Sequence, residues 1–454
     1  MKLESGFSRV DITPLLGIGL SGYYVPRTSE GVLDPLEANA LALHDGERML
    51  VFISVDNCGL APTAVYDRCR ERVAGALGIP VDSVFISATH THTSPIWGEG
   101  SDPVVQEYTR WLEARLADAA RLAAQDLRPS RMGWGVGRAE NVAFVRRFRM
   151  KDGSICTNPG VDNPDIVAPI GDVDDRVNVL CFQREGAPEI VLVNFGNHPD
   201  VVGGCRLSAD WPGFLRRRVE KALDGVRCIF FNGAQGDVNH VNVHPAGGDM
   251  NDLFMDFDDV VRGYGHARHI GNAVAGAVLQ VYEKVCWQRD ASLASAIRMV
   301  EVPSNLPDPE ALPLAREYLA LHRAGRDAEI PFEGMALTTV VAEAERMLRL
   351  EHGPSSFRMP ISAVAIGDVA LIGLPGEPFT GIGRALKQCP GWALVLPMCI
   401  TNGYEGYFPM REAYDEGGYE ARSSIFAPGV AEKLIAEGAS LLDKLRRNRG
   451  GDEP

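Results

Sequence analysis

The chain lacks the features that mark membrane, extracellular and nucleic-acid-binding proteins. It has no apolar run long enough to cross a bilayer, and residues 1–9 contain no apolar signal core. Its nine cysteines form no Cys-x-x-Cys pair, which is typical of free thiols in a reducing compartment. Acidic residues outnumber basic ones, 60 to 45, so the formal net charge of -15 disfavours a phosphate-binding surface. We therefore expect a soluble, cytoplasmic protein with no membrane anchor and no nucleic-acid partner.

Short apolar runs alternate with amphipathic segments along most of the 454 residues, and several neighbouring runs are joined by hairpin turns. This pattern predicts an α/β fold with mixed β-sheets flanked by helices, in a single catalytic domain over residues 1–447. Residues 307–353 have helical spacing and predict a peripheral helical insertion able to cap a site. Residues 448–454 are expected to form a flexible tail. Residues 249–259 are interpreted as a loop over the cleft or a subunit contact, which leaves a homo-oligomer open.

One apolar, β-branched run ends in two closely spaced histidines. It begins at Val84 and runs into Thr89-His90-Thr91-His92. Because alternate side chains of an extended strand point the same way, His90 and His92 are predicted to share a face at the strand's carboxyl end. Sites in α/β proteins are built at such ends, and neutral imidazole is a common metal ligand. The pair favours a metal site, although two surface histidines would give the same pattern.

Four more apolar runs end in turns rich in glycine or proline that carry carboxylates, amides, imidazoles or phenols. A hydrophobic core would not tolerate these groups unpaired, so five such strand ends predict one shared cleft. Glycine in these turns lets the backbone approach a ligand closely. The four segments are Asn194–Asp200, Phe230–His240, Gly373–Phe379 and Thr401–Phe408.

Eight motifs follow one another in order along nearly the whole chain: Asp11–Pro14, Leu20–Tyr23, Thr89–His92, Asn197–Pro199, Asp210–Gly213, Gly236–Val238, Pro375–Glu377 and Tyr404–Glu420. As a set they resemble the neutral, non-lysosomal ceramidase family, in its amino-terminal catalytic domain. The resemblance implies the fold of that domain and a zinc-dependent hydrolase that cleaves an amide (C–N) bond of a small-molecule substrate.

The resemblance also implies roles for individual residues. A single zinc ion would be held by four ligands, which fall here on His90, His198, Glu377 and Tyr407. His92 would be an acid/base or oxyanion-binding neighbour of the ion, and Tyr419 a second active-site tyrosine. An arginine contacting the scissile region falls on Arg146, or on Arg147 if the register shifts by one.

The chemistry of these residue types supports a hydrolytic metal site independently. Two imidazoles and a carboxylate leave zinc an open position for water, and such water becomes a nucleophile near neutral pH. Asp200 or Asp210 could orient a ligating histidine from behind. His240 and His244 are interpreted as solvated loop residues rather than additional ligands.

Two departures from the family pattern qualify the expected substrate. The position after Gly236–Val238 carries Asn239, where the family has a serine. Asparagine can donate hydrogen bonds to an oxyanion but is a poor nucleophile, so metal-activated water is the predicted nucleophile. The chain also ends where the family's immunoglobulin-like domain would begin. We expect a substrate smaller and more polar than ceramide. A lactone or ester hydrolase on the same site, and a catalytically silent metal-containing binding protein, remain alternatives.

Overall fold

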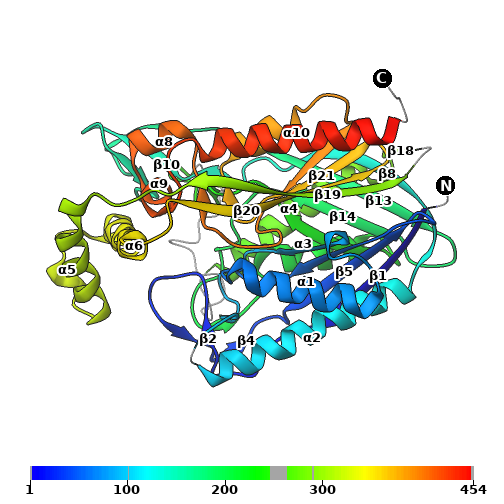
Figure 1. Cartoon of the computed structure of the whole chain (residues 1–454), viewed down its shortest axis with the longest axis horizontal. Helices are drawn as coiled ribbons and strands as arrows, with labels where there is room; N and C mark the ends of the chain where they lie inside the picture. Colours follow the sequence, from blue (N-terminus) through cyan, green and yellow to red (C-terminus); the bar gives the residue numbers. More distant parts are fainter. Residues whose placement is uncertain (1–2, 101, 246–262, 289–290, 451–454) are drawn as a thin grey trace.

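The structure is a computed structural model that describes residues 3–100, 102–245, 263–288 and 291–450. Two β-sheets lie face to face, and helices cover both outer faces (Figure 1). The predicted loop at residues 249–259 lies outside the described residues. The last helix, α10 (Val430–Gly450), runs three residues beyond the boundary predicted at residue 447. A flexible tail stays a prediction for residues 451–454, which also lie outside the described part.

A curled nine-stranded sheet forms the frame of the molecule. The pairs β6–β7 and β14–β16 are parallel and the other neighbours antiparallel, which confirms the predicted mixed sheet. Accumulated twist brings the two ends of the strand order together, and the Ser54 hydroxyl donates to the Phe230 carbonyl (2.5 Å). The strand order is β16 (Arg227–Asn232), β14 (Ile190–Phe195), β13 (Arg176–Arg184), β8 (Arg128–Arg138), β1 (Leu3–Asp11), β5 (Glu37–His44), β6 (Met49–Val55) and β7 (Val84–Ala88), with β18 (Cys286–Trp287) beside β8.

A second sheet packs on the inner face of the first. Its four strands are β19 (Leu293–Pro303), β20 (Ser356–Ile366), β21 (Val369–Gly373) and β23 (Leu394–Met398). Alternate side chains of both sheets meet in one buried apolar layer, in which Phe52 and Phe85 of the large sheet share a cluster with Leu371 and Leu396 of the small one. The face-to-face packing holds the ends of both sheets in a fixed relation.

Six helices cover the outer faces. On the large sheet, α1 (Thr63–Leu77) and α2 (Pro103–Gln125) pack on one half, and α3 (Asp210–Ala222) and α4 (Tyr264–Tyr282) on the other. On the small sheet, α10 and α7 (Thr380–Lys387) share a cluster with its strands. Helix α2 has a side-chain cap at its start, where the Asp102 side chain accepts from the Val104 N–H and proline stands at the first position. No helix in the described ranges has the length and apolar character needed to span a membrane.

Strand β8 was not expected, because glycines recur at Gly133, Gly135 and Gly137, and glycine disfavours strands. The structure explains them by close packing of α4 and the segment after it. A Cβ atom at Gly137 would lie 2.5 Å from the Ala277 carbonyl oxygen, and one at Gly133 would lie 2.8 Å from Val285. The strand can therefore accept the helix only because these side chains are missing.

Two helices project from one end of the sheets, at the left of Figure 1. These are α5 (Leu312–Arg323) and α6 (Gly334–Leu350), here called the helical arm. The arm has its own small apolar cluster, which includes Leu319, Val341 and Met347, and α6 packs against α9 (Tyr419–Ser423). Its position agrees with the peripheral helical insertion predicted for residues 307–353.

Short elements complete the described fold. They are β2 (Gly19–Leu20), β3 (Arg27–Thr28), β4 (Gly31–Val32), β9 (Phe144–Val145), β10 (Arg147–Met150), β11 (Ile155–Thr157), β12 (Ile166–Pro169), β15 (Arg206–Leu207), β17 (Val238–Asn239), β22 (Glu377–Pro378), β24 (Tyr407–Phe408) and α8 (Arg411–Glu416).

Candidate metal centre

The strand ends that carry the predicted site residues meet at one place. Asn232, the last residue of β16, donates from its side-chain amide to the carbonyls of Thr89, after β7 (3.1 Å), and Asn197, after β14 (3.0 Å). From the second sheet, the N–H of Asn402 donates to the Ile86 carbonyl (2.8 Å). Hydrogen bonds thus join the ends of both sheets around the segments that carry His90 and His198.

Two imidazoles and one carboxylate face one another in this region. The Nε2 atoms of His90 and His198 lie 3.3 and 3.2 Å from Oε2 of Glu377. All three side chains are at most 2% exposed, and Nε2 of His198 has no hydrogen-bond partner among the described residues. Burial raises the pKa of Glu377, but His90 and His198 hold it well below its usual range, so it is a carboxylate. This donor set fits a divalent cation such as zinc.

Backbone carbonyls orient both imidazoles. Nδ1 of His90 lies 2.6 Å from the Cys58 carbonyl oxygen, and Nδ1 of His198 lies 3.0 Å from that of Gln235. Because a carbonyl oxygen only accepts, each Nδ1 carries a ring hydrogen, and each Nε2 is the ring nitrogen that can bind an ion beside Glu377. Burial and the nearby Arg146 charge lower the pKa of His198, which keeps that ring neutral, as a ligand must be.

The carboxylates expected behind the histidines do not orient them. Asp200 pairs with His240 (3.0 Å), and Asp210 accepts from the N–H groups of Val202 and Trp211. The prediction that these two aspartates orient a ligating histidine is therefore wrong, because carbonyls occupy the positions behind the rings. The interpretation of His240 as solvated is also wrong, since it is buried, whereas the His244 side chain is 62% exposed.

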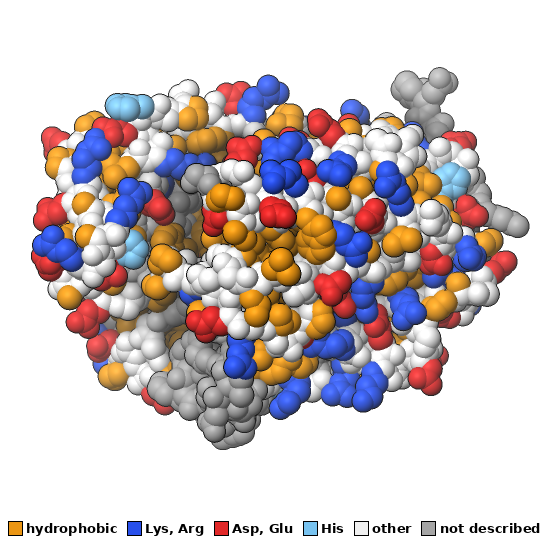
Figure 2. Space-filling view, turned by 90° about the horizontal axis from the view of Figure 1, so that it is seen from below, with side chains coloured by type: hydrophobic (Ala, Val, Ile, Leu, Met, Phe, Trp, Pro, Cys, Tyr) orange, Lys and Arg blue, Asp and Glu red, His pale blue; other side chains and the backbone are white. Residues whose placement is uncertain are grey.

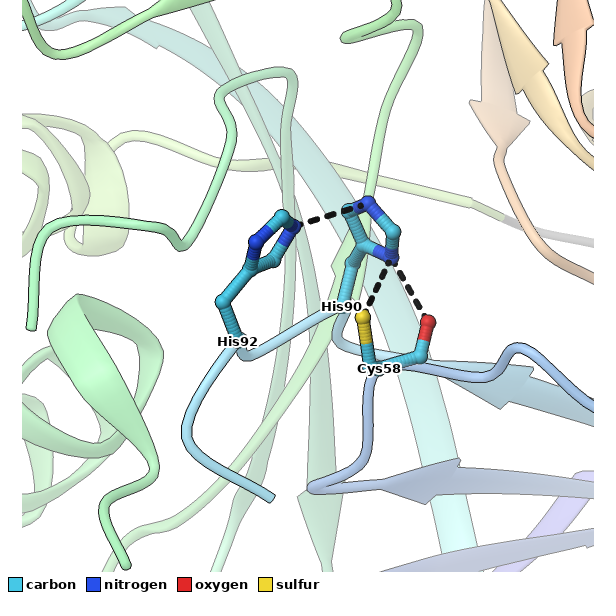
Figure 3. A group of neighbouring side chains, drawn as sticks. All are labelled: Cys58, His90 and His92. Atoms are coloured by element: carbon cyan, nitrogen blue, oxygen red, sulfur yellow. Dashed lines mark hydrogen bonds between the residues drawn. The ribbon is translucent and has the colours of Figure 1, made fainter. Parts of the chain in front are cut away.

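His90 and His92 come together through a turn rather than along a strand. Strand β7 ends at Ala88, and His90 has a φ of 76°, in the left-handed region that non-glycine residues seldom adopt. The alternation argument therefore does not describe this backbone. The two rings still lie 4.8 Å apart, with their Nε2 atoms 3.3 Å apart (Figure 3). Burial and the neighbouring His90 lower the pKa of His92 well below its usual value, so it is neutral.

Cys58, which was not predicted, belongs to a second group of candidate ligands with His90 and His92. Its thiol lies 3.6 Å from Nδ1 of His90, on the other side of the ring from the nitrogen that faces His92 (Figure 3). Because Nδ1 already donates to the Cys58 carbonyl, the group with Glu377 fits an ion better. Cys58 follows β6, the parallel neighbour of β7, and this shared edge was the signal that could have located it.

A cavity of about 370 Å³ opens on the site. Its wall contains His90, His92 and Glu377, together with the tyrosines Tyr23, Tyr24, Tyr404, Tyr407 and Tyr419. Burial raises the pKa values of Tyr404, Tyr407 and Tyr419 well above the usual range, so their hydroxyls stay protonated and can donate hydrogen bonds.

Two tyrosines have different relations to Glu377. Tyr407 in β24 lies opposite Glu377 in β22, in register, and its ring centroid is 5.5 Å from that of Tyr419. Tyr404 was not predicted, yet its hydroxyl donates to Oε1 of Glu377 (2.9 Å). Its position in the tyrosine-bearing segment after β23 was the available signal. Tyr407 as a fourth metal ligand stays a prediction.

The two candidate arginines lie side by side around the buried carboxylate of Glu420. Nε of Arg146 lies 2.6 Å from Glu420, and its guanidinium carbon lies 5.4 Å from the ring centroid of Tyr407. Arg147 lies 3.1 Å from Glu416 and stacks on Phe379. Arg146 is thus the arginine beside the tyrosine wall, but the described cavity wall does not include it.

Asn239 does not reach the cavity wall. Its Nδ2 donates to Asn158 (3.0 Å), and its Oδ1 accepts from the Val241 N–H (3.0 Å). It lies in β17, which pairs with β9 just before Arg146. These contacts indicate that Asn239 holds the loop that positions Arg146, and an oxyanion-binding role for it stays a prediction.

Comparisons with known proteins found likenesses to the family that the motifs resemble. No family model matches the chain. Over 95 residues it is 30% identical to neutral ceramidase B of Dictyostelium discoideum, a stretch covering 19% of this chain and 13% of that protein. Over 97 residues it is 33% identical to the neutral ceramidase of Mycobacterium tuberculosis, covering 20% of this chain and 15% of that protein. The matched stretches are thus a small part of each curated relative.

Solved structures extend the likeness to the whole fold. The neutral ceramidase of Pseudomonas aeruginosa matches 99% of this chain and 75% of its own length, with a TM-score of 0.74 at 19% identity. A ceramidase complexed with C2 matches 99% and 76%, with a TM-score of 0.73 at 19% identity. The fold expected from the motifs is therefore confirmed: the chain has the fold of the neutral ceramidase structures.

Proposed function

We propose that this protein is a zinc-dependent hydrolase that cleaves an amide bond of a small-molecule substrate. The observation that carries the proposal is the convergence of the Nε2 atoms of His90 and His198 on the Glu377 carboxylate, beside a cavity. The names of the matched proteins, which are ceramidases, support amide chemistry.

His90, His198 and Glu377 would hold the ion, with Tyr407 as the proposed fourth ligand. A divalent ion held there supplies Lewis acidity, which activates water and polarises a carbonyl group at neutral pH. The chain contributes the orientation of the ligands: carbonyls direct the two imidazoles, and the Tyr404 hydroxyl holds one oxygen of Glu377 so that the other faces them.

Other cavity residues would act on the substrate. His92 is neutral and lies beside His90, so it can accept a proton from the attacking water and pass one to the leaving nitrogen. Tyr419 keeps its hydroxyl proton and can donate to the oxygen that becomes negative during attack. Arg146, beside Tyr407, would position the tyrosine wall from behind.

Metal analysis of protein purified without added metal tests the proposal, together with a panel of amides, esters and lactones. We expect about one equivalent of zinc, amide hydrolysis that chelation abolishes and zinc restores, and loss of both metal and activity in His90→Ala. The matched control is His352→Ala, whose side chain is 91% exposed and outside the cavity wall. Full amide hydrolysis by metal-free protein would overturn the proposal, and metal retention with no hydrolysis would favour a binding protein.

A further inference from the structure

A second cavity of about 630 Å³ lies between the first one and the helical arm. The two cavities share five wall residues at their junction: Tyr24, Glu345, Tyr404, Tyr407 and Tyr419. The outer wall of the second cavity, here called the arm cavity, comes from α5 and α6. In Figure 2 the arm is the left-hand lobe, where charged side chains of both signs gather beside a hollow. A substrate that reaches Glu377 can extend past the tyrosines into the arm cavity.

Three arginines line the arm cavity and not the first one: Arg323 from α5, and Arg346 and Arg349 from α6. Arg346 is 9% exposed, and its Nη1 donates to the Asn305 carbonyl (2.7 Å), while its Nε has no hydrogen-bond partner among the described residues. Within the described ranges, neither Arg323 nor Arg349 has an ion-pair partner within 4.0 Å. Unpaired guanidinium groups at a cavity stand out in a chain with a formal net charge of -15.

Of the three arginines, Arg346 has a carboxylate within ion-pair distance, since its Nη2 lies 3.7 Å from Glu343. Glu405 accepts a hydrogen bond from the Thr63 hydroxyl (2.5 Å), on the side of α1. Glu345 lines both cavities, so it lies at the junction. The remaining wall of the arm cavity is largely apolar and includes Leu319, Leu348 and Ile425. From the junction outward, the surface therefore changes from tyrosine hydroxyls to an apolar wall with guanidinium groups.

We propose that the arm cavity binds an anionic group, a carboxylate or a phosphate, at the far end of the amide substrate. The planar fork of arginine matches both anions, and the apolar wall suits a short carbon spacer between the anion and the scissile bond. This inference rests on the proposed hydrolase function and names its substrate class. It also gives a physical reason for a substrate more polar than ceramide.

Amides that share one scissile bond and one spacer but end in a methyl, a carboxylate or a phosphate test the inference. We expect wild-type kcat/KM to be at least about tenfold higher for an anionic end. Arg323→Gln and Arg349→Gln should each lose much of that preference, mainly through a higher KM for the anionic amides. Arg316→Gln is the matched control, because Arg316 is also on α5 but pairs with Glu351 outside both cavities. Equal kcat/KM for methyl and anionic ends would overturn the inference and leave the hydrolase intact.

Binding measurements separate the two ideas if no amide is cleaved. Calorimetry with glutarate and with inorganic phosphate reports on the arm cavity without catalysis. Binding to wild type and to Arg316→Gln, but at least about tenfold weaker binding to the Arg323→Gln/Arg349→Gln double variant, would support the cavity even though the hydrolase proposal had failed. Binding of neither anion, or binding that the double variant retains, would overturn it. The tighter of the two anions identifies the group.

Discussion

The cavity beside the metal site and the arm cavity are built in different ways. On the metal side, His198 and Glu377 follow strands of two packed sheets, are almost completely buried, and are joined by hydrogen bonds between strand ends. On the arm side, α5 and α6 form a small separate cluster and present exposed charges to the cavity. The difference fits the two proposed roles: the packed sheets hold the metal ligands in place, and the helical arm selects the substrate by its anionic end.

The largest expected effect comes from a change on the metal side, because the reaction is proposed to take place there. Glu377→Gln keeps the shape of the side chain and removes the charge that faces both imidazoles. We expect metal content near zero and amide hydrolysis below detection, measured by elemental analysis and product formation. Glu412→Gln, on the exposed surface of α8, should retain both. Normal hydrolysis by Glu377→Gln would place the chemistry elsewhere.

Tyr404→Phe tests whether the hydrogen bond from the Tyr404 hydroxyl to Glu377 contributes to metal binding and catalysis. The change removes the 2.9 Å hydrogen bond to Oε1 of Glu377 and leaves the carboxylate held by the longer hydrogen bond that Gln235 donates to Oε2 (3.3 Å). Loss of such a partner costs about 10- to 100-fold in metal affinity or activity, so we expect a decrease of that size in chelator competition and in kcat. Tyr414→Phe, which loses only a contact with Ser424, is the control. Equal effects of the two changes would argue against an orienting role.

Asn239→Ala separates a catalytic role from a structural one. If its amide stabilised an oxyanion, kcat would fall about 100-fold or more. Because both ends of the amide bond to neighbouring loop atoms, we expect instead less than about a tenfold loss in kcat and about 1–2 kcal/mol less stability in urea unfolding. Asn239→Ser should not improve hydrolysis of the native substrate. Ceramide cleavage that appeared only in Asn239→Ser would contradict the water mechanism.

The smallest expected effect concerns the frame alone. Although burial raises the pKa of Asp174, Arg176 and Lys387 of α7 lower it to about 2. The ionised form is therefore stabilised by folding, and this contribution of up to about 2 kcal/mol is present above pH 4 and lost as the pH falls towards 2.

Asp174→Asn should therefore lower the free energy of unfolding at pH 7 but much less at pH 3, as measured in urea. Asp415→Asn, on the exposed surface of α8, should change the free energy of unfolding by less than about 0.5 kcal/mol at both pH values. An equal loss for Asp174→Asn at both pH values would show that the ion pairs contribute little.

The strand pattern predicted much of the frame and the general position of the site. Apolar runs that end in polar turns have a strong physical signature, so the ends that carry His90, His198 and Glu377 could be recognised. Strand β8 could not, because the glycines that admit α4 also weaken its propensity. The choice between Tyr404 and Tyr407 depends on which way a loop turns, and the contacts of Asn239 depend on residues far along the chain. No local pattern records those long-range contacts.

The left-handed backbone at His90 limits how this motif could be transplanted into a designed protein. A His-Thr-His placed on a regular strand would not reproduce the turn that brings the two rings together. The graft would also need the Asn57 carbonyl, which accepts from the His90 N–H (2.9 Å), and the Pro199 carbonyl, which accepts from the His92 N–H (3.0 Å). The transferable unit is therefore three loop segments, which follow β6, β7 and β14, rather than a tripeptide.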